Sequence, residues 1–104
     1  GANIELTDAR LRMLTASASS GSDIALSGRA EEIELDASSG ADIDAEDLDA
    51  LAGRLEASSG ADISARLSEQ VRARASSGGD IEIDGNPQQR DVDTSSGGDV
   101  HFEN

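Results

Sequence analysis

A short motif returns at nearly equal intervals along the 104-residue sequence. Each complete copy consists of two serines, a glycine, a small residue, an aspartate and an aliphatic residue, and the copies begin at Ser19, Ser38, Ser58, Ser76 and Ser95. Gly1-Ala2-Asn3-Ile4 matches the end of a sixth copy, and from Gly1 the motif glycines follow at intervals of 20, 19, 20, 18 and 19 residues. This regular interval predicts a solenoid, in which each repeat forms one coil and packs only on its neighbours.

Apolar and polar residues alternate on both sides of each motif glycine, which predicts two short strands per repeat. The third residue after the glycine is aliphatic in every complete copy, giving a predicted core ladder of Ile24, Ile43, Ile63, Ile81 and Val100. Equivalent strands of stacked repeats lie parallel. The predicted fold is therefore all-β, a parallel β-solenoid (β-helix) of five to six rungs of about 19 residues, coiled right-handed like other parallel crossovers.

The same alignment predicts two outward columns of charged residues. One column contains Thr15, Glu34, Arg54, Arg72 and Asp91, and the other contains Ser17, Asp36, Glu56, Arg74 and Asp93. Several neighbours in these columns carry opposite charges, which stabilise adjacent strands by about 0.2–1 kcal/mol per pair. Like charges also meet, so the columns support the register without proving it.

The composition limits what the chain can do. Acids outnumber bases 22 to 8, for a net charge of -14, and there is one Phe and no Tyr, Trp or Cys. High charge with few large apolar residues is typical of disorder, and only the repeat favours a fold. The charge argues against nucleic acids and anionic membranes, the lack of cysteine excludes disulfides, and no apolar run is long enough to span a membrane.

The motif glycines are predicted to form a structural corner ladder, because glycine adopts positive φ at little cost. This ladder comprises Gly21, Gly40, Gly60, Gly78 and Gly97. A phosphate-binding loop is not expected, since the chain has no lysine and no strand-to-helix context. Serine hydrolase chemistry is not expected either, because the single histidine, His101, cannot serve as the base for five serine pairs.

The motif aspartates form a second part of the corner ladder: Asp23, Asp42, Asp62, Asp80 and Asp99, with Asn3 at its start. Ionised carboxylates about 5 Å apart repel one another, so each one either caps backbone N–H groups at its corner or shares a bridging cation. Oxygen-only ligands suit Ca²⁺, and the candidate ligands are Asp42, Asp44, Asp80 and Asp84. No catalytic residue, no dedicated metal site and no other cofactor is predicted.

Two segments lie outside the strand pattern. The apolar residues of Ala45 to Ala57 also fit helical spacing, so a short helical turn within Ala45 to Leu51 is an alternative to a strand. Gly85-Asn86-Pro87 predicts a turn.

A family resemblance follows from these motifs. The repeated Ser-Ser-Gly-x-Asp-Ile copies, with Asp44-Ala45-Glu46-Asp47-Leu48 after one and Gly85-Asn86-Pro87 after another, resemble the bacterial family described as "putative auto-transporter adhesin, head GIN domain". The resemblance covers essentially the whole chain, and Ser76 to Asn104 is similar to the C-terminal end of that family. It implies a β-helical domain of the bacterial cell envelope, periplasmic or surface-exposed, with no catalytic or ligand-binding residues to transfer.

The sequence thus predicts one repeat domain over residues 1–104, corresponding to the later part of a longer domain. We expect a non-enzymatic, rigid and acidic solenoid that mediates structural or adhesive contacts with a protein or surface partner. The alternatives are a Ca²⁺-stiffened spacer and a carbohydrate-active β-helix enzyme, in which acid pairs such as Asp42 and Asp44 would act. Unpaired strand edges at the two ends predict end-to-end association of copies, unless a missing N-terminal portion covers the first rung.

Overall fold

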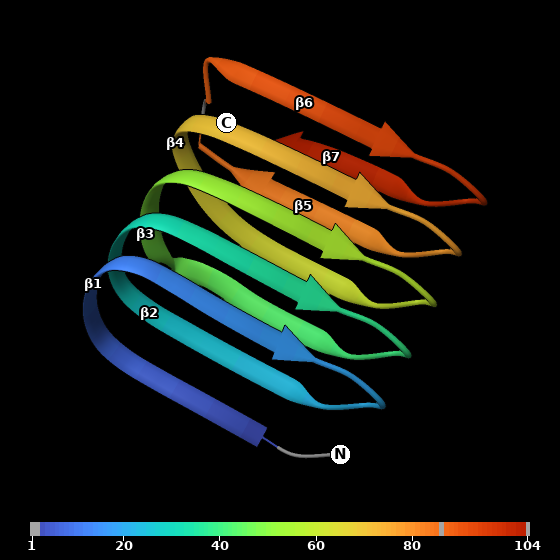
Figure 1. Cartoon of the computed structure of the whole chain (residues 1–104), viewed down its shortest axis with the longest axis horizontal. Helices are drawn as coiled ribbons and strands as arrows, with labels where there is room; N and C mark the ends of the chain where they lie inside the picture. The colour runs from blue at the N-terminus through green and yellow to red at the C-terminus, as the bar shows by residue number, and fades with distance from the viewer. Residues whose placement is uncertain (1–2, 86, 104) are drawn as a thin grey trace.

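The computed structural model describes residues 3–85 and 87–103, apart from the side chains of residues 8, 9, 11 and 103. Its strands all pair in parallel within one continuous sheet. They are β1 (Asn3–Ala18), β2 (Asp23–Ala37), β3 (Asp42–Ala57), β4 (Asp62–Ala75), β5 (Asp80–Asp84), β6 (Gln89–Thr94) and β7 (Asp99–Glu103). The prediction of a parallel β-solenoid is confirmed (Figure 1).

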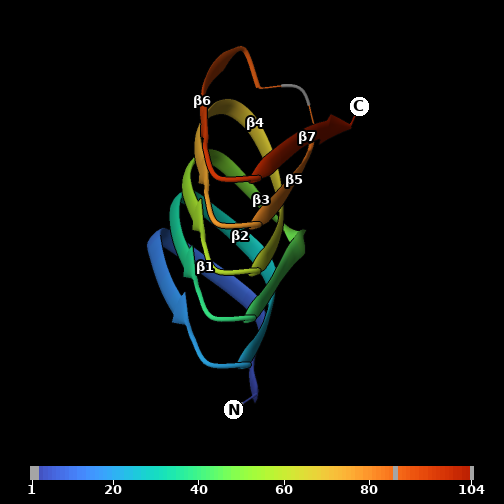
Figure 2. The same ribbon diagram turned by 90° about the vertical axis from the view of Figure 1, so that its right-hand side faces the viewer.

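Each rung is a flattened loop with two layers. The half-strands that follow the motif glycines form the layer behind in Figure 1, and the half-strands that precede the next corner form the layer in front. The chain reverses at a bend on the left and at the Ser-Ser-Gly corner on the right, and the corners stack in Figure 2. The front half-strands run from left to right while the chain climbs toward its C-terminus, so the coil is right-handed, as predicted.

Rungs stack in the register that the repeat predicts. Ile24 pairs with Ile43, Ile43 with Ile63, Ile63 with Ile81, and Ile81 with Val100. The four isoleucines are buried and Val100 is partly buried, so the core ladder forms one vertical file inside the coil. Alternation of buried and exposed residues is kept along most of β2, β3 and β4 because the pleat sets the inward and outward faces of a strand, whereas every residue of β6 is exposed.

The interior is filled by small and medium aliphatic side chains. Among its largest fully buried members are Leu35, Leu48, Leu55, Ile63 and Leu67, and alanines fill most of the space between them. No polar or charged side chain is buried among the described residues. A narrow coil of this kind buries its few large residues almost completely, so its backbone ladders and stacked aliphatic files offset a composition that is typical of disorder.

The corner is a type I′ β-turn, repeated in every rung. At the third corner Ser59 has φ +54° and Gly60 has φ +80°, and the Ala61 N–H donates to the Ser58 carbonyl over 3.1 Å. The Gly60 N–H donates in turn to the Ser77 carbonyl of the next rung over 3.1 Å, so the ladder of backbone hydrogen bonds continues through the corner. The sequence predicted the role of the glycine but not the positive φ of the serine before it.

The helical alternative for Ala45 to Leu51 is wrong, because the whole segment belongs to β3. The pairing of β3 with β4 jumps from Ala45–Ala65 to Asp49–Arg66, so β3 has extra residues at the bend. This irregularity turns Leu48 inward, which produces the apparent helical spacing without a helix. In the predicted turn after β5, Gly85 has φ +100° and Pro87 is buried, whereas Asn86 lies outside the described residues.

The two ends of the coil expose apolar side chains. Ile4 and Met13 of β1 are 53% and 56% exposed, and Val92 of β6 is 42% exposed. The chain as described contains no helix of the length and apolar character that crossing a membrane requires.

Candidate functional site

The outer side of the first half-strands is an acidic face. In register, its first column is Asn3, Asp23, Asp42, Asp62, Asp80 and Asp99, and its second column is Glu5, Ala25, Asp44, Ser64, Glu82 and His101. The motif aspartates are therefore stacked one rung apart, as the sequence predicted for the corner ladder. No arginine stands in either column, and most of their residues are acidic.

The middle of the aspartate column shows the cost of this arrangement. Partial desolvation, and then the neighbouring carboxylates of Asp42 and Asp80, raise the pKa of Asp62 above its ordinary value of 3.8. Side-chain hydrogen bonds to the same two neighbours also favour its protonated form. Within the described residues the structure gives no hydrogen bond from a backbone N–H to these motif carboxylates, so it lends no support to the backbone-capping interpretation, which stays a prediction.

The four candidate Ca²⁺ ligands are spread over the coil. Asp42 and Asp80 have Asp62 between them in the column, whereas Asp84 pairs in register with Arg66 at the bend. The Asp44 carboxylate accepts the Glu46 N–H over 3.3 Å. Within residues 3–85 and 87–103, no three His, Cys, Asp or Glu side chains are grouped to hold a metal ion.

The outer side of the second half-strands is a mixed face, with arginines and acids in alternating groups. The predicted columns are present: Glu34, Arg54, Arg72 and Asp91 form one row, and Asp36, Glu56, Arg74 and Asp93 form the next. Arg72 Nε lies 3.4 Å from Asp91 Oδ2, and Arg74 Nε lies 3.8 Å from Asp93 Oδ2. Arg54 makes no such ion pair with the described residues.

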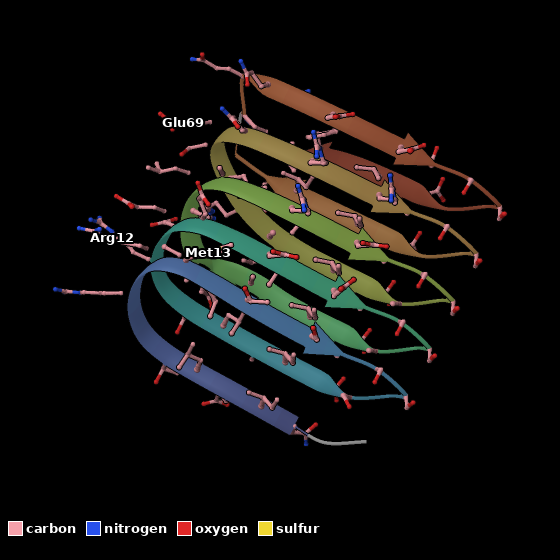
Figure 3. All side chains as sticks on the ribbon, viewed as in Figure 1. Arg12, Met13 and Glu69 are labelled. Atoms are coloured by element: carbon pink, nitrogen blue, oxygen red, sulfur yellow. The ribbon has the colours of Figure 1, made fainter. Side chains whose placement is uncertain are left out.

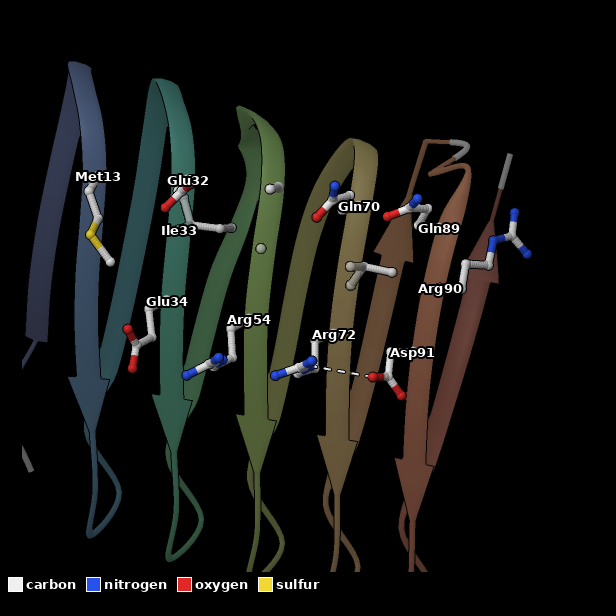
Figure 4. A pocket seen from close by; sticks show the side chains of 13 residues that line it. Met13, Glu32, Ile33, Glu34, Arg54, Gln70, Arg72, Gln89, Arg90 and Asp91 are labelled. Carbon is white, nitrogen blue, oxygen red and sulfur yellow. Dashed lines mark ion pairs between the residues drawn. The ribbon is translucent and has the colours of Figure 1, made fainter.

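A shallow hollow of about 500 Å³ lies on this mixed face (Figure 4). One side is the charged row that includes Arg54 and Arg72, and the other side is a row with Gln70 and Gln89. Ala52 lies in the second row, where its small side chain leaves the space open. The hollow thus presents guanidinium, carboxylate and amide groups on a floor of hydrogen-bonded backbone.

Sequence reasoning found the charged row but not the hollow beside it. The row follows from the constant distance to the motif glycine, which the repeat makes visible. The second row lies nearer the bend, where the register shifts between Ala50 and Ala52. The available signal was the set of residues eight positions before each motif glycine: Met13, Glu32, Ala52, Gln70 and Gln89.

The arrangement offers groups that can make polar contacts. His101 pairs in register with Glu82 on the acidic face, far along the coil from the first serine corners. The mixed face has no aromatic side chain on which a sugar or a base could stack. Its chemistry is that of a rigid, hydrogen-bonding and charged surface.

Fold and surface together define a β-solenoid repeat domain with one acidic and one mixed outer face. Residues 1–87 match the family described as "putative auto-transporter adhesin, head GIN domain". The match covers most of the 104 residues, and the chain belongs to this family. No curated protein and no solved structure matches the chain significantly.

Proposed function

We propose that this domain is a non-enzymatic contact module of the bacterial cell envelope, periplasmic or surface-exposed, and that it binds its partner through the mixed face. Membership of an adhesin-like family supports an adhesive role and an envelope or surface location. The observation that carries the proposal is the hollow between the Arg54–Arg72 row and the Gln70–Gln89 row. There, guanidinium, carboxylate and amide groups project side by side from the paired strands.

Charge distribution favours this face over the acidic one. An acidic face repels most bacterial surfaces, which are themselves anionic, and it keeps the domain soluble. On the mixed face, neighbouring charges of opposite sign reduce that repulsion and allow close approach. Arg54 is exposed there and free of ion pairs within the described part of the chain, so its guanidinium can bind a partner carboxylate in fork geometry.

Binding of domain-coated beads to purified bacterial envelope preparations tests the proposal. We expect wild-type beads to be retained above blank beads, and the mixed-face variant Arg54→Gln/Gln70→Ala to lose several-fold. The matched control Asp44→Asn/Ser64→Ala alters two positions of the acidic face and should be retained like the wild type. Wild-type beads that behave like blank beads, or equal losses in both variants, would contradict the proposal.

A Ca²⁺-stiffened spacer is the second candidate, and the raised pKa of Asp62 is the observation that favours it. A column of carboxylates that repel one another is a surface on which a cation would relieve repulsion. A ligand that binds only the folded form raises the melting temperature. A rise in millimolar Ca²⁺ that is absent in Mg²⁺ would support this candidate, and an unchanged melting temperature would discard it.

End-to-end association of copies is a separate contact, made through the strand edges and not through the mixed face. The exposed edge of β1 carries Ile4, and unpaired edges of this kind pair readily with other strands. Light scattering over a range of concentrations tests it, and a strict monomer at the highest concentration would exclude it.

A further inference from the structure

Three arginines surround a second hollow, at the bend between the two layers. Arg10, Arg12 and Arg29 line an open space of about 940 Å³, larger than the hollow of the mixed face. Small residues, among them Gly28 and Ala50, line it as well and leave it open. Figure 3 shows Arg12 at the outer end of this bend, with its side chain directed away from the coil.

Two of these arginines stack on each other, as Arg54 and Arg72 do on the mixed face. At the bend the register column reads Arg10, Arg29, Asp49, Arg66 and Asp84. Arg10 therefore lies against Arg29, and like charges on neighbouring strands are destabilising. The next residue in the column, Asp49, is already paired with the arginine on its other side, because Arg66 Nη1 lies 3.9 Å from Asp49 Oδ1.

None of the bend arginines makes an ion pair with a described side chain, although Glu31 and Asp49 line the same hollow. No ion pair or hydrogen bond joins Arg10, Arg12 or Arg29 to any side chain that the structure describes, whereas Arg66, Arg72 and Arg74 each have an acidic partner. Arg10 and Arg29 thus form a stacked pair in which neither guanidinium makes an ion pair with a described side chain. An external anion would remove the repulsion between them.

We propose that this bend binds the carboxylate of an acidic sugar, held between the guanidiniums of Arg10 and Arg29. Guanidinium presents its N–H donors in a planar fork that fits a carboxylate with two parallel hydrogen bonds. Two such groups in adjacent rungs can bind both oxygens of one carboxylate from opposite sides. Arg12, on the same hollow, adds a third positive charge.

The other groups that line the hollow indicate which kind of molecule bears the carboxylate. Glu31, Asp49 and Ser68 offer oxygen acceptors around the hollow, and they suit the hydroxyl groups of a sugar. Leu51, 44% exposed, offers an apolar surface for the C–H face of a sugar ring. The two carboxylates, with the net charge of -14, repel a polyanion. The favoured ligand therefore has one isolated acidic group on an otherwise uncharged body.

Titration of the 104-residue chain with sodium glucuronate, followed by NMR, tests this proposal. Sodium chloride at equal ionic strength is the reference, glucose is the neutral probe and heparin is the polyanionic probe. We expect millimolar binding of glucuronate with shifts confined to the bend of β1 and β2, no binding of glucose, and heparin binding no tighter than glucuronate. Glucose shifts equal to those of glucuronate, or heparin binding much tighter at the bend, would overturn the proposal.

The variant Arg10→Gln/Arg29→Gln tests whether these two guanidiniums bind the glucuronate. Charged hydrogen bonds contribute enough that its affinity for glucuronate should fall about tenfold or more. Arg74→Gln, which removes an arginine that is paired with Asp93 and lines neither hollow, is the control and should bind like the wild type. Without ligand, the double variant should melt at a higher temperature than the wild type because the like-charge contact is gone. Unchanged glucuronate affinity in a folded double variant would overturn the site, and it would leave the proposed role of the mixed face untouched.

Discussion

Asp62 stacks between Asp42 and Asp80, its register partners in the rungs on either side. The pKa of Asp62 is raised in the folded chain by partial desolvation and by these two carboxylates. The folded state therefore binds this proton more tightly than the unfolded state does. The resulting loss of stability is complete above the raised pKa and disappears as the pH falls below the ordinary value of 3.8.

The first prediction concerns this column. Asp62→Asn should raise the free energy of unfolding at pH 7 by roughly 0.2–1 kcal/mol, because the amide removes two like-charge contacts. The gain should shrink on acidification, since the wild-type carboxyl then becomes neutral as well. Thermal melts of both proteins between pH 3 and 7 measure the difference. Asp47→Asn, whose register partner is Ser27, is the control, and an equal gain there would assign the effect to overall charge.

The second prediction concerns the strained serine of the corner. Ser59 has φ +54°, a conformation that serine adopts at a cost and that asparagine tolerates better. Asn-Gly is the preferred pair for a type I′ turn, so Ser59→Asn should stabilise the fold by a few tenths of a kcal/mol up to about 1 kcal/mol. Gly60→Ala should do the opposite, although its new Cβ would meet open space, because its φ of +80° is unfavourable for alanine.

Chemical denaturation of these two variants beside the wild type measures the expected gain and the expected loss in free energy of unfolding. Ser58→Asn replaces the neighbouring serine, which does not have positive φ, and serves as the control. If Ser59→Asn and Ser58→Asn shift the denaturation midpoint equally, the strain at Ser59 is not the cause.

Much of the fold could be predicted because the repeat makes the register visible. The interval between motif glycines fixes which residues stack, and alternation then fixes the inward file of Ile24, Ile43, Ile63 and Ile81. The same distance rule gave the charged rows, including the neighbours Arg72 and Asp91. These predictions needed only the rule that each residue stacks on its equivalent in the next repeat.

The bend could not be predicted in the same way. Pairing shifts there in the first three strand pairs, as at Ala45 to Asp49, so counting forward from the preceding motif glycine fails beyond the shift. Arg10 and Arg29 match only when counted back from the next motif glycine, as do Gln70 and Gln89. Both hollows border this irregular part of the rung, which explains why sequence reasoning placed its candidate sites at the corners instead.

The third prediction concerns the interior. Leu55 is fully buried, and Leu55→Ala should lower the free energy of unfolding by about 2–5 kcal/mol through lost transfer energy and the cavity left behind. Leu51→Ala is a matched control, since the same atoms are removed from a side chain that is 44% exposed, and it should cost much less. Urea denaturation with a common slope measures both. Similar costs for the two variants would contradict the assignment of Leu55 to the core.

The fourth prediction concerns the ion pair of Arg72 with Asp91, whose side chains are 62% and 67% exposed. Exposed pairs gain little because water screens the charges and both side chains lose freedom, so the coupling energy should lie below about 1 kcal/mol. A double-mutant cycle with Arg72→Ala and Asp91→Ala measures it. The coupling should fall further in high salt, since the Debye length shortens to about 3 Å at 1 M. A salt-independent coupling well above that bound would show that the mixed face is held by its ion pairs, and not by the backbone ladders beneath them.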